Sequence, residues 1–163
     1  MTRAIPVLAA LALSLSAAGA VKAADSVEVG TLDCVVEGGA SFVFGSSRNL
    51  ECTFTSVDPN SPGETYTGVI DKFGIDIGVK GKELIHWVVV APANSAYAAG
   101  ELAGEYTGAS ASASFAAGLG ANVLVGGSER SFALQPVSVQ AQEGVNLAVG
   151  IAQMKLAAAG PRG

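Results

Sequence analysis

The stretch NLECTFTS, residues 49–56, alternates strictly between apolar and polar side chains. Leu50, Cys52 and Phe54 fall on one side of an extended chain, and glutamate and threonine occupy the positions between them. A period of two is typical of a β-strand with one buried face and one exposed face. We therefore predict a half-buried strand over these residues.

Similar runs recur along the chain and are bounded by turn-forming residues. KFGIDIGVK, residues 72–80, sets phenylalanine, isoleucine and valine against lysine and aspartate. ELIHWVVVAP, residues 83–92, is apolar at nearly every position, which is typical of a central strand covered on both faces. His86 and Trp87 are expected to point to opposite sides of that strand.

In the segment ERSFALQPVSVQAQ, apolar and polar residues alternate, but the parity of the apolar positions changes once. Phe132 and Leu134 have one parity, whereas Val137 and Val139 have the other. An extra residue near Gln135 and Pro136 would return the two valines to the apolar face, and a β-bulge inserts such a residue. We predict a bulge at this point, where proline is tolerated because it cannot donate to the ladder.

Small residues dominate two further stretches. From Ala109 to Ser114, alanine and serine alternate, and between 146 and 152 one face of GVNLAVGIAQMKL is made of asparagine, alanine and glycine. We interpret 109–114 as a strand that approaches another backbone closely, with the 146–152 face as its natural partner. A flexible linker is the alternative interpretation.

About eight to ten short strands are expected after residue 24. The predicted fold is all-β, a single compact antiparallel sandwich or small closed barrel preceded by a signal helix. We divide the chain into a signal peptide at 1–23, a β-rich domain at 24–157 and a flexible C-terminal tail at 158–163.

The N-terminus has the three parts of a secretory signal. Arg3 supplies the positive charge, an apolar run extends from Ile5 to Leu15, and a small-residue cleavage site precedes the bond between Ala23 and Ala24. The apolar run is shorter than the roughly 20 residues that cross a bilayer. We expect a periplasmic or secreted protein, with no transmembrane segment in the mature chain.

The sequence contains two cysteines, Cys34 and Cys52. An even number of cysteines in an exported chain favours a disulfide, and closing this loop would stabilise the fold by about 3 kcal/mol. Because bonded cysteines need Cα atoms within about 7 Å, a simple meander of strands at 27–36, 40–44 and 49–56 does not fit. The two cysteine strands should be direct neighbours or face each other across two layers.

Charge and composition argue against several functions. The formal net charge is −5, and loss of Arg3 and Lys22 with the signal makes it −7. An acidic domain without a lysine or arginine cluster is poorly suited to nucleic acid. Half of the residues are hydrophobic, which argues against disorder. We expect no cofactor and no metal.

No catalytic constellation is visible in the sequence. A serine–histidine–aspartate site would have to use the single histidine, His86, inside an apolar strand and without a G-x-S-x-G elbow. Asp71 and Asp76 should lie on opposite faces of a strand, and Glu101 and Glu105 near a turn are expected to serve solubility. We therefore predict no enzyme activity.

The turn-rich segment DPNSPGE, residues 58–64, should form an exposed loop. Asp58, Asn60 and Glu64 could suggest a calcium site, but their spacing differs from the EF-hand loop. We expect a plain turn.

Four segments together resemble the bacterial domain-of-unknown-function family 992. They are VGTLDCVVEGGASFVFGSSRNLECTFT, YTGVIDKFGIDIGV, GANVLVGG and LQPVSVQAQEGVNLAVGI, and the likeness covers about residues 28–156 with both cysteines. The resemblance implies a small exported protein without an established activity. More loosely, GASASASFAAGLGA followed by EGVNLAVGI is similar to SYLF-type lipid-binding domains, although Arg130 is the only basic residue in the matching region.

From these observations we expect an exported envelope protein with a non-catalytic structural or partner-binding role. Its partner would be another envelope protein. The alternative is a binding module that holds a lipid or another apolar small molecule between its sheets or in its interior.

Overall fold

The structure is a computed structural model that describes residues 25–41, 46–72, 78–108, 114–116, 118–119, 122–141 and 151–161. The predicted signal peptide, its cleavage site at Ala23 and Ala24, and the small-residue face at 146–150 lie outside these residues. The elements are β1 (Ser26–Val36), β2 (Gly39–Ser41), β3 (Ser46–Ser56), β4 (Glu64–Lys72), β5 (Gly78–Lys80), β6 (Glu83–Pro92), β7 (Gly104–Gly108), β8 (Leu124–Gly126), β9 (Phe132–Ala141) and β10 (Ile151–Pro161), with two short 3-10 turns, η1 (Ser114–Ala116) and η2 (Ser128–Arg130).

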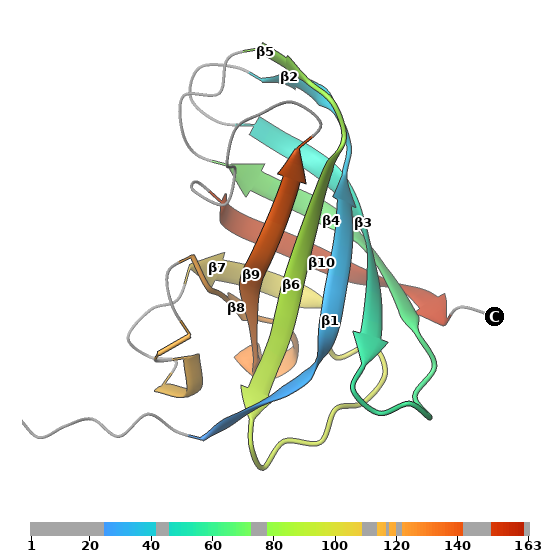
Figure 1. The fold of residues 1–163 in the computed structure, drawn as a ribbon, viewed down its shortest axis with the longest axis vertical. Coiled ribbons are helices and arrows are strands. Elements are labelled where there is room, and N and C mark those ends of the chain that lie inside the picture. Colours follow the sequence, from blue (N-terminus) through green and yellow to red (C-terminus); the bar gives the residue numbers. More distant parts are fainter. Residues whose placement is uncertain are drawn as a thin grey trace, which may run out of the picture.

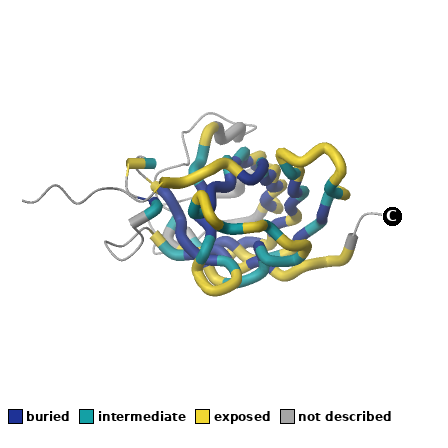
Figure 2. Tube along the Cα trace, turned by 90° about the horizontal axis from the view of Figure 1, so that it is seen from below, coloured by how far each residue is buried: buried dark blue, intermediate teal, exposed yellow. Residues whose placement is uncertain are grey.

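Within the described residues, eight strands close into an antiparallel barrel in the order β1-β3-β4-β10-β7-β8-β9-β6 (Figure 1). β2 and β5 pair separately, beyond the upper end of the barrel. The end-on view in Figure 2 shows the chain trace as a ring, along which buried and exposed residues alternate. The all-β prediction is confirmed, and of the two predicted architectures the chain adopts the closed barrel.

The barrel interior is lined by side chains at alternating strand positions. The largest fully buried residues are aromatic: Trp87, Tyr66, Tyr106 and Phe54. Burial of a large apolar side chain stabilises a fold by about 1.5–3 kcal/mol relative to its exposed state. The alternation in 49–56 is confirmed, because Leu50, Cys52 and Phe54 belong to this core.

The disulfide joins two neighbouring strands. β1 pairs with β3 in a register that places Cys34 directly opposite Cys52, and their Cα atoms are 4.0 Å apart. The predicted bond is thus present, and of the two predicted arrangements the cysteine strands are direct neighbours. β2 does not lie between them, because it pairs with β5.

β6 is a central strand, hydrogen-bonded to β1 on one side and to β9 on the other. Trp87 points into the barrel and is fully buried, whereas His86 lies on the outer face and is partly exposed, as predicted. The ladder to β9 shifts its register between Ser138 and Pro136, so the predicted bulge is present. Val137 is the extra residue and is 60% exposed, which corrects its predicted place on the apolar face.

The small-residue stretch follows a different course from the predicted strand. β7 ends at Gly108 and Ser114 begins η1, so Ser114 is not in a strand; 109–113 lie outside the described residues. Ala116 of η1 packs with Ala133 and Val125 in a second apolar cluster on the outside of β6, β8 and β9. Because alanine side chains are small, η1 can lie close to the outer surface of the barrel at this contact.

The loop at 93–103, between β6 and β7, closes the lower end of the barrel in Figure 1. Leu102 is fully buried in the main core. The ring of Tyr97 lies 4.8 Å from that of Phe54 and 5.9 Å from that of Phe132. The loop is therefore an apolar plug.

β10 completes the barrel by pairing with β4 on one side and β7 on the other. Met154 and Leu156 point into the core. The strand continues to Pro161, opposite Glu64, so residues 158–161 are part of the sheet and do not form the flexible tail that we predicted from 158 onward. No helix among the described residues is long and apolar enough to cross a membrane.

Candidate functional site

An open groove of about 840 Å³ lies on the outside of the barrel, in the described part of the molecule. It runs over five adjacent strands, β6, β1, β3, β4 and β10. We call it the outer groove, and it is lined by Asp33, Val35, Glu37, Asn49, Leu50, Glu51, Thr53, Thr67, Gly68, Val69, Lys82, Leu84, Lys155, Leu156 and Ala157.

Strand register places the groove residues in rows that run across the strands. The central row is continuous over all five strands, since each of its members is paired with the next: Leu84, Val35, Glu51, Thr67 and Ala157. These residues occupy the outward parity of their strands, opposite to the core positions. The groove thus changes along this row from an apolar end at β6 to an acidic centre at β3.

The apolar end of the groove is exposed. Leu84 is 50% exposed and Val35 is 37% exposed, and the two side chains are cross-strand neighbours. Val69, near the other end, is 36% exposed. Single exposed apolar residues are ordinary on a protein surface, but adjacent ones in a groove rimmed by polar residues are typical of interaction sites.

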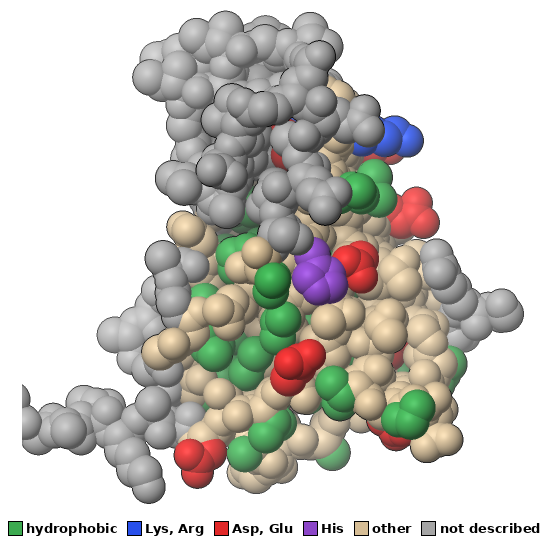
Figure 3. Space-filling model, viewed as in Figure 1, with side chains coloured by type: hydrophobic (Ala, Val, Ile, Leu, Met, Phe, Trp, Pro, Cys, Tyr) green, Lys and Arg blue, Asp and Glu red, His purple; other side chains and the backbone are tan. Residues whose placement is uncertain are grey.

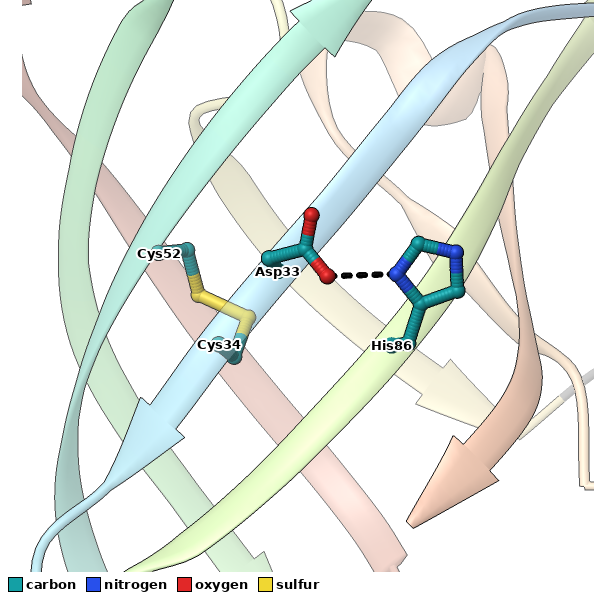
Figure 4. Close-up of a disulfide and its surroundings, with 4 residues drawn as sticks. All are labelled: Asp33, Cys34, Cys52 and His86. Atoms are coloured by element: carbon teal, nitrogen blue, oxygen red, sulfur yellow. Dashed lines mark hydrogen bonds and ion pairs between the residues drawn. A yellow bond between two sulfur atoms is a disulfide. The ribbon is translucent and has the colours of Figure 1, made fainter. Parts of the chain in front are cut away.

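One margin of the groove carries a histidine–carboxylate pair. His86 Nδ1 and Asp33 Oδ1 are hydrogen-bonded, from neighbouring strands β6 and β1 (Figure 4). The disulfide of Cys34 lies on the opposite, buried face of the same strand. In the space-filling view the single histidine lies beside an acidic side chain on the front of the barrel (Figure 3).

A lysine–glutamate pair lies at the other margin. Lys155 Nζ donates to Glu105 Oε1 at 2.8 Å, on the surface of β10 and β7. This hydrogen bond and the attraction of opposite charges lower the pKa of Glu105 and raise the pKa of Lys155. A smaller hollow of about 280 Å³ continues the groove past this pair; both hollows include Val69 and Lys155, and the smaller one adds Asp71 and Glu105.

Two buried polar clusters lie away from the groove. At the lower end, Glu64 accepts hydrogen bonds from Tyr66 Oη at 2.6 Å, Tyr97 Oη at 2.7 Å and the backbone N–H of Gly100 at 2.8 Å. At the start of β6, Glu83 Oε1 lies 3.7 Å from Nη1 of Arg48, and both side chains are almost fully buried.

The environment of Glu64 affects the tyrosines around it. Burial, followed by the hydrogen bond to Glu64, raises the pKa of Tyr66 to about 12. Burial also raises the pKa of Tyr97, and its hydrogen bonds to Tyr66 and Glu64 act in the same direction. The carboxylate fixes the plug loop to β4, because Tyr97 and Gly100 belong to the loop and Glu64 begins the strand.

The structure separates most residues that the sequence singled out. Asp58 and Asn60 form an exposed turn, in which Asp58 accepts from the Asn60 backbone N–H, but Glu64 is buried and points to the plug loop rather than the turn. Glu101 accepts from the backbone N–H of Ala98 within that loop. Glu105 lies on β7, so the two glutamates are not a pair.

Of the two aspartates expected on opposite faces of a strand, Asp71 accepts a hydrogen bond from Ser47 Oγ on β3, and Asp76 lies outside the described residues. Among the described residues no three histidine, cysteine, aspartate or glutamate side chains are grouped so that they could hold a metal ion. The outer groove could not be predicted from the sequence, because its residues come from five strands whose order no local pattern reveals.

A family model described as "Protein of unknown function (DUF992)" matches residues 13–157. No curated protein and no solved structure gives a significant match.

Proposed function

We propose that this chain, which belongs to the DUF992 family of proteins of unknown function, is an exported, non-catalytic envelope protein that binds a partner protein through the outer groove. Membership of that family assigns no activity. The observation that carries the proposal is the groove itself, with Leu84 and Val35 exposed side by side at one end. A partner that covered both side chains would gain about 25 cal/mol for each Å² of apolar surface removed from water.

Export is supported by the disulfide. The bond between Cys34 and Cys52 is buried in the core, and such bonds form and persist in oxidising compartments. We propose that the signal at 1–23 is removed and that the protein works in the periplasm or outside the cell. Mass spectrometry of the protein from its source cells should give a chain that begins at Ala24; an intact N-terminus on the exported fraction would contradict this.

The non-catalytic role is supported by the position of the one histidine. His86 is hydrogen-bonded to Asp33 on the open outer surface, where water reaches the ring. Active sites enclose their general bases in pockets that exclude water. We infer that this pair orders the margin of the groove and fixes the orientation of the Asp33 carboxylate.

The experiment is site-specific photo-crosslinking in cells of the source organism. A photoreactive residue at Leu84 should give a discrete protein adduct, whereas the same residue at Val57, which is 59% exposed but outside the groove, should not. Excess wild-type protein should suppress the Leu84 adduct, and excess Leu84→Asp protein should not. Identical adducts from both positions, or none from Leu84, would overturn the proposal.

A second candidate, an apolar ligand inside the barrel, is favoured by one observation. Nε1 of Trp87 is fully buried and has no hydrogen-bond acceptor among the described residues. A ligand with an oxygen at this point would satisfy the indole N–H. Native mass spectrometry of the protein purified from its own envelope tests this candidate, because a bound ligand adds a defined mass to the folded protein.

A further inference from the structure

The charge of the outer groove identifies the chemistry of its partner, and this inference rests on the proposed function. We propose that the groove binds an extended, basic segment of a partner polypeptide that presents apolar and cationic side chains on one and the same face. Three features of the groove support this: its unbalanced charge among the described residues, the order of its residues across the five strands, and its length.

Carboxylates outnumber lysines along the groove. The outer groove and the smaller hollow that continues it are lined by five carboxylates and two lysines. Lys155 is bound to Glu105, and Asp33 is bound to His86. Glu51, at the centre of the groove, has no ion-pair partner among the described residues. Because the whole chain also has a formal net charge of −5, a cationic segment is attracted both at long range and at the site.

The order of residues in the central row sets the pattern of the partner. Leu84 and Val35 lie next to each other, and Glu51 is the next residue of the row, directly opposite Val35. An apolar side chain over the first two residues and a cationic one near Glu51 would satisfy both. In an extended segment these two side chains are two residues apart, because successive residues face opposite sides. This arrangement fits an amphipathic peptide better than a simple metal ion or polyamine, because those cannot cover Leu84 and Val35.

The length of the groove fits a short extended segment. Five adjacent strands at a spacing of about 4.8 Å span about 19 Å. An extended chain rises about 3.3 Å per residue, so six residues cross the groove. Threonine and asparagine side chains on the floor, such as Thr53, Thr67 and Asn49, supply donors and acceptors for a peptide backbone.

The test uses three labelled hexapeptides, VVKKVV, VVEEVV and VVSSVV, with the purified disulfide-bonded protein; in an extended chain each has the variable residue between two valines on either face. Fluorescence anisotropy at low ionic strength should show that VVKKVV binds at least about tenfold more tightly than VVSSVV, and that VVEEVV binds more weakly than both. Added salt should weaken VVKKVV binding, because the screening length shortens. Chemical shifts of backbone amides should change on β1, β3 and β6.

A matched pair of charge reversals separates the groove from the general acidity of the protein. Glu51→Lys should weaken VVKKVV binding by about tenfold. Glu28→Lys changes the net charge equally at an exposed position outside the groove and should change binding less than twofold. Glu51→Gln, a milder change on the same exposed surface, should give an intermediate loss.

The outcomes separate this inference from the proposed function. If VVEEVV or VVSSVV binds as tightly as VVKKVV, or if both charge reversals have equal effects, the basic partner is excluded. A specific adduct from Leu84 in cells would then still support partner binding at the groove. If that adduct joins Leu84 to an acidic or uncharged segment, the inference fails and the proposed function stands; if it joins a basic segment, both are supported.

Discussion

Removal of the Glu64 carboxylate should release the plug loop at 93–103. In Glu64→Ala, Tyr66 Oη, Tyr97 Oη and the Gly100 N–H all lose their acceptor. The two hydroxyls lie 3.0 Å apart, so they can bond to each other, and one hydroxyl proton and the Gly100 N–H remain unsatisfied. Each unsatisfied buried donor costs about 1–3 kcal/mol.

The carboxylate itself is costly to bury, so its removal returns part of this loss. We therefore expect the free energy of unfolding to fall by about 2–4 kcal/mol in Glu64→Ala. Glu64→Gln should lose less, because its amide oxygen still accepts from a tyrosine or from Gly100. Glu28→Ala, at an exposed position, should change stability by less than about 0.5 kcal/mol.

Urea denaturation at neutral pH measures the loss of stability, and hydrogen exchange measures the loop directly. The amide of Gly100 should exchange faster in Glu64→Ala, while amides in the β1–β3 ladder keep their relative protection. If Gly100 exchange and the unfolding midpoint both match the wild type, Glu64 does not hold the loop and our account of this end of the barrel is wrong.

Three further results are expected. Replacing Cys34 and Cys52 together by alanine should lower the free energy of unfolding by about 3 kcal/mol, since the bond closes a loop of separation 18; a urea-measured loss below about 1 kcal/mol would contradict this. Absorbance at 295 nm should show no tyrosine ionisation near pH 10 in the folded protein, because all three tyrosines have raised pKa values and that of Tyr66 is about 12. Because the folded protein keeps these tyrosines protonated above their unfolded pKa near 10, their contribution to stability is complete below pH 10 and declines as the pH rises toward 12. A phenolate signal at pH 10 without unfolding would refute the burial argument. Gly68→Ala should destabilise strongly, because a Cβ there would lie 1.9 Å from the Lys155 carbonyl oxygen, whereas Gly108→Ala meets nothing within 4 Å and should leave the thermal midpoint nearly unchanged or raise it.

The strands with a clear period of two could be predicted because alternation is a local property. The burial of Leu50, Cys52 and Phe54 could be predicted from their spacing alone. The change of parity near Gln135 and Pro136 was sufficient to predict a bulge. The cysteine spacing excluded the simple meander. The choice between a sandwich and a closed barrel could not be predicted, because it depends on which strands pair across long distances in the sequence.

The polar clusters and the groove were missed for related reasons. Glu64 ends a run of turn formers, so it was placed in an exposed loop, although it shares a strand parity with Tyr66 and both face inward. Its donors Tyr97 and Gly100 are more than thirty residues away. In the groove, the alternation of the sequence shows that Glu51 and Leu84 face outward. They lie near each other only because β1 pairs with both of their strands, β3 and β6.

The position of β10 has a consequence for how the chain reaches its native state. The ladders of β4 and β7 are both completed by residues 151–161, which follow all the other strands of the barrel in the sequence. Until these residues are available, the nascent sheet is an open ribbon with two unsatisfied edges, and such edges can pair with other chains. We therefore expect the ribbon to be most prone to aggregation before β10 is in place.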